Sequence, residues 1–182
     1  LFLRLQPWSS QSIVSSIDVG IGDRLMMYGY GPKTEVRKTT ENSFFLYAGA
    51  KGQFRQYLSW DALMHYNILG DRIGDFDINA NVLFNTYPFR KARKSPLSIS
   101  ASFSQTLKEP NFYQEHFYSN HYAWDNNFKK VSTTRIEGRL DIPHWKLDAS
   151  VGYAILGNGT FYDNCGYIRQ KENAVSIITA SL

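Results

Sequence analysis

The sequence has 182 residues, enough for one ordinary domain, and it combines 43% hydrophobic with 20% charged residues. This composition excludes a disordered chain and a uniformly apolar helix bundle. The net charge of +4 is too small to indicate a nucleic-acid partner, and the single cysteine, Cys165, excludes a disulfide framework within the chain. The longest apolar stretch, at 44–50, is far shorter than the ~18 residues of a membrane-spanning helix.

Apolar and polar side chains alternate along most of the chain, which is the two-residue period of an extended strand. The alternation is clear at 74–87, where Phe76, Ile78 and Val82 alternate with Asp77 and Asn79. We find no helical stripe in any segment longer than a turn. The pattern predicts about eight strands, over 12–30, 41–50, 53–68, 74–87, 96–107, 128–142, 145–156 and 173–182.

The predicted strands are long, and the connections between them differ in length. Several strands exceed the ~5–6 residues usual in soluble sheets and reach the ~9–11 residues that cross a bilayer at a tilt. Short connections are predicted at 50–53 and 143–144, and long loops near 31–41, 108–127 and 157–172. Short turns on one side and long loops on the other are typical of outer-membrane barrels.

Strongly polar side chains follow one another on one face of the predicted strands, which suits a hydrated lumen. The interleaved charges of Arg135, Glu137, Arg139 and Asp141 predict a charge ladder across the lumen that tunes ion selectivity or braces the wall. The lumen-facing candidates are Arg55, Asp61, Asp75, Asp77, Asn79, Asn81, Arg135, Glu137, Arg139, Asp141, Lys146 and Asp148.

Aromatic residues gather near the ends of the predicted strands. Amphipathic rings prefer the headgroup level of a membrane, so two aromatic girdles are expected, although aromatic residues also favour strands in general. The predicted membrane-interface aromatics are Trp8, Tyr28, Tyr30, Trp60, Tyr87, Trp124 and Trp145.

An open sheet edge cannot lie in lipid, because each unpaired backbone N–H or C=O costs several kcal/mol there. We therefore predict an all-β fold, an antiparallel up-and-down transmembrane β-barrel, with residues 1–182 as a single barrel segment. Because the last predicted strand runs to Leu182, further strands from the same or another chain are expected to complete a larger barrel.

Several stretches resemble the "putative porin" family of Bacteroidota outer-membrane proteins. They are LFLRLQPWSSQSIVSSIDVGIG at 1–22, YAGAKGQ at 47–53, ILGDRIGDFDI at 68–78, YSNHYAWDNNFKK at 118–130 and AVSIITASL at 174–182. The similarity runs along nearly the whole chain, and the stretch at 118–130 is its most specific part. The resemblance implies an outer-membrane β-barrel with a channel role. Family members are longer and begin with a signal peptide, so this sequence resembles a segment of one.

The sequence contains little evidence for a catalytic or metal site. His116 and His121 lie near Glu115 and Asp125, but their spacing fits no standard metal site, and a polar loop is the better interpretation. An inward fold of this loop, constricting the pore, is a further hypothesis. Paired carboxylates such as Asp75 and Asp77 lack an accompanying nucleophile motif. We therefore expect no enzyme activity, no metal and no cofactor.

We predict a porin-like passive diffusion channel for small polar solutes in the bacterial outer membrane. Its expected partners are outer-membrane lipid, the remaining barrel strands and other outer-membrane proteins in a complex, with no nucleic acid. Two alternatives stay open. One is a soluble β-sandwich or lipocalin-like module that binds glycans or other ligands, and the other is a non-conducting structural barrel subunit of a surface complex. The basic run at 89–94 fits a solvated turn, with contact to anionic headgroups as its functional alternative.

Overall fold

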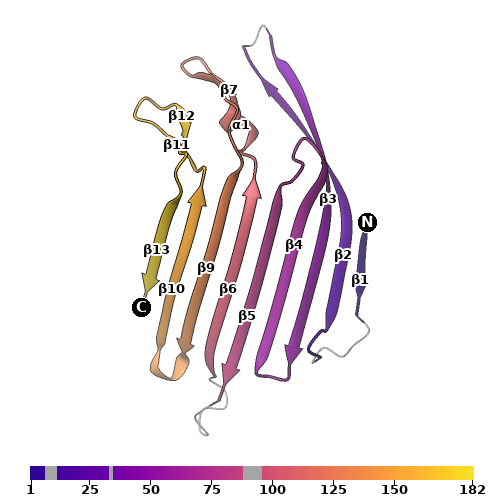
Figure 1. Ribbon diagram of the computed structural model, residues 1–182, viewed down its shortest axis with the longest axis vertical. Coiled ribbons are helices and arrows are strands. Elements are labelled where there is room, and N and C mark those ends of the chain that lie inside the picture. Colours follow the sequence, from indigo (N-terminus) through magenta and orange to yellow (C-terminus); the bar gives the residue numbers. More distant parts are fainter. Residues whose placement is uncertain (7–11, 33–34, 88–95) are drawn as a thin grey trace.

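The computed structural model describes residues 1–6, 12–32, 35–87 and 96–182, and nearly all regular structure in them is β-strand. Nine strands form one antiparallel sheet in chain order (Figure 1), so the prediction of an all-β antiparallel fold is confirmed. These strands are β1 (Phe2–Leu5), β2 (Ser16–Tyr30), β3 (Arg37–Phe54), β4 (Leu58–Gly70), β5 (Phe76–Thr86), β6 (Leu97–Lys108), β9 (Val131–Ile142), β10 (Leu147–Gly157) and β13 (Val175–Ser181). The sheet is open, with β1 and β13 at its two edges, and is not closed into a barrel within these residues.

Each of the eight predicted strands has a counterpart in the sheet, and β1 is an additional short strand that pairs with β2. The turn predicted at 50–53 is wrong, because β3 continues to Phe54 and the chain turns at 55–57. Gly52 looks like a turn residue in the sequence but serves a close approach: a Cβ at this position would lie 1.6 Å from the carbonyl oxygen of Ile13. Trp60 Nε1 donates a hydrogen bond of 2.8 Å to the same oxygen.

The two longest connections, 109–130 and 158–174, lie at one end of the sheet, which we call the outer end, and the turns 55–57 and 143–146 lie at the other, the inner end (Figure 1). The predicted loop 31–41 is shorter than expected, because β2 and β3 stay paired up to Tyr30 and Arg37. The loop 109–130 carries α1 (Phe112–Glu115), β7 (His116–Tyr118) and β8 (Ala123–Asp125), and the loop 158–174 carries β11 (Thr160–Tyr162) and β12 (Ile168–Gln170). The inner turn after β9 contains the short helix η1 (Pro143–Trp145).

Register divides the sheet into two chemically different faces, because residues opposite each other in neighbouring strands point to the same side. The apolar face includes Ile17, Val19, Met64, Ile78, Val82, Phe84, Ala101, Ile99, Phe103, Ile136, Val151, Tyr153 and Ile178. The polar face includes Asp18, Lys51, Asp61, His65, Asp77, Asn79, Asn81, Ser102, Ser104, Arg135, Glu137, Arg139, Asp141 and Asp148. The two-residue period of the sequence is therefore the period of the structure.

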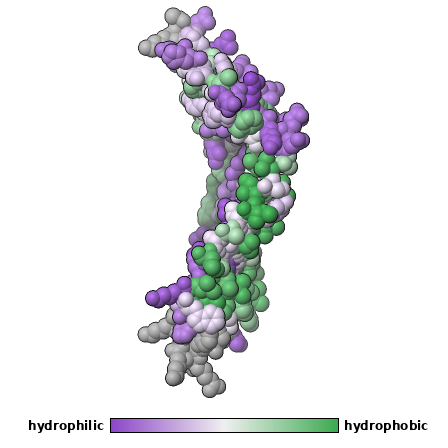
Figure 2. Space-filling model, turned by 90° about the vertical axis from the view of Figure 1, so that its left-hand side faces the viewer, coloured by the Kyte–Doolittle hydropathy of each residue, from purple (hydrophilic) through white to green (hydrophobic). Residues whose placement is uncertain are grey.

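The apolar face has no cover in the described part of the chain. Among all described residues, the buried hydrophobic ones are Phe112, Ile142 and Ile168. On the apolar face, by contrast, Ile99 is 48% and Val151 is 60% exposed. Figure 2 shows the sheet bowed, with hydrophobic residues gathered on its convex side and hydrophilic residues on the other. A sandwich would cover its apolar face with a second sheet and a lipocalin-like module would turn apolar residues inward, and the described residues show neither arrangement.

Helices contribute little to the fold. Among the residues that the structure describes, no helix has the length and hydropathy needed to cross a membrane.

Candidate functional site at the outer end of the polar face

Nine of the twelve predicted lumen residues lie together on the polar face. Arg139 Nε donates to Asp148 Oδ1 across β9 and β10 at 2.8 Å, and Arg135 Nη2 donates to Glu137 Oε2 along β9 at 2.6 Å. The charge ladder therefore consists of pairs between close neighbours. The nine residues are Asp61, Asp77, Asn79, Asn81, Arg135, Glu137, Arg139, Asp141 and Asp148.

The other three predicted lumen residues do not lie on a strand face. Arg55 and Lys146 occupy the inner turns with φ values of 51° and 53°, so the left-handed backbone takes them out of the alternation. Asp75 precedes β5 at the outer end, and only 5% of its side chain is exposed. Alternation mispredicts residues at the ends of strands because the extended backbone on which it depends stops there.

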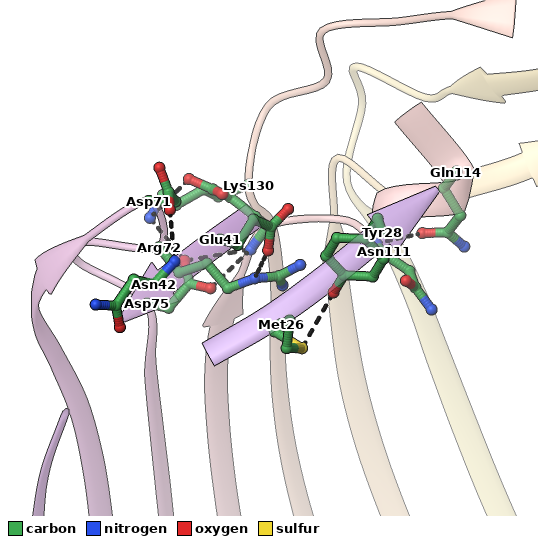
Figure 3. A network of polar contacts seen from close by, with 11 residues as sticks. Met26, Tyr28, Glu41, Asn42, Asp71, Arg72, Asp75, Asn111, Gln114 and Lys130 are labelled. Carbon is green, nitrogen blue, oxygen red and sulfur yellow. Dashed lines mark hydrogen bonds and ion pairs between the residues drawn. The ribbon is translucent and has the colours of Figure 1, made fainter. Parts of the chain in front are cut away.

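Asp75 is the centre of a polar network at the outer end (Figure 3). Lys130 Nζ lies 2.6 Å from Asp75 Oδ1 and donates a bond of 2.6 Å to the carbonyl oxygen of Ile73. The backbone N–H of Glu109 lies 3.2 Å from each carboxylate oxygen of Asp75, and the Glu109 carboxylate lies 3.4 Å from Lys130 Nζ. One buried carboxylate therefore joins the β4–β5 turn, the end of β6 and the start of β9.

A second pair of contacts ties the β4–β5 turn to β3. Arg72 Nε donates to Glu41 Oε2 at 3.0 Å, and the backbone N–H of Asn42 donates to Asp71 Oδ2 at 2.7 Å. Burial is the largest single effect on Arg72 and lowers its pKa, but the hydrogen bond and charge of Glu41, together with the nearby Tyr28 and Asp75, outweigh burial, so the pKa of Arg72 is raised. These contacts fix the outer rim of the polar face (Figure 3).

A cavity of about 260 Å³ opens on the polar face next to this network, and we call it the outer cavity. Its lining comes from five strands and the β4–β5 turn, so it exists only because the sheet brings them side by side. The lining residues are Arg24, Phe45, His65, Asn67, Arg72, Asp75, Phe76, Asp77 and Lys108.

Arg24 differs from the other cations of the outer cavity. Its guanidinium carbon lies 5.7 Å from the centre of the Phe45 ring, which is a cation–π geometry. Within the described residues no carboxylate lies at ion-pair distance from Arg24, whereas Lys108 pairs with Asp77 and Arg72 with Glu41. The cavity therefore presents one guanidinium with its donors unsatisfied by an internal anion.

The loop 109–130 reaches over the polar face to β2. The ring of Phe112 stacks on Tyr28 with centres 4.1 Å apart and planes 5° apart, and it contacts Tyr30 edge-on at 5.4 Å. Both tyrosines stand on the polar side of β2, and Phe112 is 3% exposed. Figure 1 shows the outer parts of β2 and β3 bending toward α1. The loop is thus docked on a strand four positions away in the sheet from β6, where it begins.

Comparison with protein families decides what kind of chain this is. A family model described as "Putative porin" matches residues 11–182. The chain belongs to the putative porin family. The family resemblance drawn from the sequence is therefore confirmed. No curated protein and no solved structure gives a match.

The predicted interface aromatics of this porin-family chain fall into two groups. Trp60 lies on the apolar face near the inner turn, Tyr87 directly follows β5, and Trp145 lies in η1 at the inner end. Trp124 stacks on Phe117 within the β7–β8 hairpin, and Tyr28 and Tyr30 hold Phe112 on the polar side. Trp8 and the basic run at 89–94 lie outside the described residues. The inner group lies at or next to the inner end of the sheet, whereas the outer group packs loops.

The histidine-rich loop is held by hydrogen bonds. His116 Nδ1 lies 2.6 Å from Asp125 Oδ1 across the β7–β8 pair, and Glu115 Oε1 accepts the N–H of Phe128 at 3.3 Å. Burial raises the pKa of Glu115, against the opposing effect of that N–H. Over the described ranges, no three His, Cys, Asp or Glu side chains are placed to hold a metal ion.

Sequence reasoning missed the cations of the outer end in this porin-family chain. Arg24 continues the alternation of β2 outward from Asp18, so its face was predictable once the strand was taken to be uninterrupted at Gly20 and Gly22. Lys108 and Lys130 flank the long loop, and no local pattern shows that they meet Asp77 and Asp75. Their pairing depends on which strands are neighbours.

Proposed function

We propose that this chain forms part of the wall of a closed outer-membrane β-barrel through which small polar solutes diffuse. The apolar face supports this role most directly, because it extends across the sheet, no described part of the chain covers it, and it matches the hydrocarbon of a bilayer. The polar face then encloses water, in which its charges remain hydrated or paired.

Barrel closure follows from the same physics. Along their free edges, β1 and β13 carry backbone N–H and C=O groups without a partner strand in this sheet. In lipid these groups need hydrogen-bond partners, so further strands complete the wall. Family membership supports an outer-membrane setting. The lumen-facing set is the nine strand residues of the polar face together with Arg24 and Lys108 of the outer cavity.

Single-channel recording of the full-length native protein in planar bilayers tests this function. We expect discrete conductance steps that scale with the salt concentration, and none from detergent alone or from heat-denatured protein. Steady insertion into the membrane without conductance would overturn the channel and favour the alternative, a structural barrel in a surface complex.

One observation favours the alternative of a non-conducting structural barrel. The loop 109–130 crosses the outer end of the polar face and is fixed by the buried ring of Phe112. A loop anchored in this way narrows the lumen, and in a small barrel it would plug it. Recording from a variant that lacks residues 111–125 separates a narrowed channel from a plugged barrel. Only a plugged barrel would be non-conducting before the deletion and conducting after it.

A further inference from the structure

Many charges of the polar face are held in ion pairs, whereas Lys51, Asp61, Asp141 and, in the outer cavity, Arg24 are in none among the described residues. Lys108 pairs with Asp77, Lys130 with Asp75, Arg72 with Glu41 and Arg139 with Asp148. Arg24 is left without such a carboxylate among the described residues, and its guanidinium lies near the ring of Phe45.

The charge of the outer cavity can be counted from its lining. Arg24, Arg72 and Lys108 contribute three positive charges, and Asp75 and Asp77 contribute two negative charges, which leaves 3 − 2 = +1. Three charged neighbours of the lining, Glu41 on Arg72 and Lys130 and Glu109 beside Asp75, add one positive and two negative charges. The positive charge available to a ligand is therefore the local charge of Arg24, which no carboxylate among the described residues pairs.

The chemistry of Arg24 suits one class of ligand. A guanidinium presents five N–H donors in a planar fork that matches the two oxygens of a carboxylate or phosphate, and it stays charged at any physiological pH. The guanidinium carbon of Arg24 lies 5.7 Å from the centre of the Phe45 ring, and no carboxylate among the described residues occupies its N–H donors. The outer cavity, at about 260 Å³, is larger than the space that one water needs and has room for a small anion.

We propose that the outer cavity is a recognition site for the carboxylate or phosphate group of small anionic solutes, with Arg24 as the residue that contacts the anion. This inference rests on the proposed channel and specifies its substrate class. Anions entering from the outer end meet Arg24 on the lumen wall, so the pore favours them over cations of equal size.

Reversal potentials in a KCl gradient test the inference. The permeability ratio of chloride to potassium is expected to exceed one in the native protein and to fall roughly threefold in R24Q, since a unit charge near the ion path is removed. The matched control is R55Q, because Arg55 is also an exposed arginine 5.7 Å from a phenylalanine ring but lies in an inner turn outside the cavity. An equal ratio in native protein and R24Q, with conductance intact, would overturn the anion site while leaving the channel in place.

Arginine modification gives a readout that does not need conductance. Phenylglyoxal reacts with free guanidinium groups, and inorganic phosphate is expected to slow its reaction at Arg24 at least threefold while leaving Arg55 unchanged, as followed by peptide mass spectrometry. Equal protection of both arginines would show that phosphate acts without a site and would refute the inference. Selective protection in a protein that never conducts would support the site and refute the channel.

Discussion

Asp75 illustrates at the residue scale how a buried charge is retained in a sheet without a core. Its carboxylate receives Lys130 Nζ and the N–H of Glu109, so its lone pairs are used although water is largely excluded. A buried carboxylate without partners would be far more expensive than one exposed on the polar face. The residue therefore positions three elements of the outer rim and does not act as a free lumen charge.

Replacement of Lys130 by methionine is expected to destabilise the protein by about 3 kcal/mol, because it leaves the buried Asp75 carboxylate uncompensated. Unfolding by denaturant in detergent measures this loss. The control is K129M, which removes an exposed neighbouring lysine and should change stability by less than about 0.5 kcal/mol. The double variant D75N/K130M should recover part of the loss, and an equal loss in all three would contradict the role of the pair.

The raised pKa of Glu115 makes the stability of the loop 109–130 depend on pH. Its pKa is raised, chiefly by burial, so the folded loop holds a proton more tightly than the unfolded chain does. The resulting stabilisation is complete below the ordinary glutamate pKa of about 4.3 and is lost as pH rises through the raised value. Hydrogen-exchange protection of the loop should therefore fall from pH 4 to pH 7.

In E115Q this fall should disappear, because the amide oxygen still accepts the N–H of Phe128 but carries no charge. The exposed carboxylate of Glu35 provides the control, and E35Q should keep the pH dependence of the native loop. A native loop with equal protection at both pH values would contradict the argument.

At the scale of elements, the loop 109–130 and strand β2 form one unit although the sheet places β3, β4 and β5 between β2 and β6. Aromatic packing makes this possible, because Phe112 is held between Tyr28, Tyr30 and the edge of Tyr113. Such ring pairs each stabilise a contact by about 1 kcal/mol beyond the burial of their area.

F112A is expected to release this loop from β2. Loss of the buried ring should cost about 3 kcal/mol of docking free energy and lower the exchange protection of residues 112–125. If the docked loop narrows the lumen, conductance should rise as well. F161A removes an exposed ring of β11 that makes no ring contact within the described chain, and it should leave both quantities unchanged. Unaltered protection in F112A would show that the loop is held by other contacts.

At the scale of the whole molecule, the apolar face of the sheet is stable against lipid and the polar face is stable against water. Ala101 and Ser102 are neighbours on β6, similar in size, and they point to the apolar and polar faces respectively. Ala101 lies between Val82 and Gly138, and Ser102 lies between Asn81 and Glu137.

A101K is therefore expected to lower the unfolding free energy in lipid bilayers by about 2–4 kcal/mol, because it places an ammonium group in hydrocarbon. S102K should cost less than about 1 kcal/mol, because the lysine meets water and Glu137. Reversible unfolding from phospholipid vesicles measures both. Equal costs for the two lysines would mean that the faces do not separate lipid from water.

Ionic strength provides a test of the pore as a whole. The Debye length falls from about 10 Å at 0.1 M salt to about 3 Å at 1 M. The preference for anions that we assign to Arg24 should therefore weaken in 1 M KCl toward the ratio of the ions in bulk solution. Reversal potentials measured at equal concentration ratios but different absolute concentrations give this dependence. A preference that stays constant would point to selection by pore size.

The sequence alone determined which side chains share a face. Alternation placed Asp77, Asn79, Arg135 and Glu137 together because the two-residue period of a strand is a local property of its backbone. The family resemblance and the order of the long strands were also readable from the chain, since antiparallel neighbours in a meander follow one another in sequence. Alternation failed at Arg55 and Lys146, where the left-handed backbone of a turn interrupts the period.

Only the tertiary structure decided which charges remain unpaired. Lys130 meets Asp75 across 55 positions of sequence, and Phe112 meets Tyr28 across the face of the sheet. These contacts depend on strand register and on the bend of the outer hairpin, which no local pattern encodes. The free guanidinium of Arg24 became visible only after every neighbouring cation had been matched to its carboxylate in three dimensions.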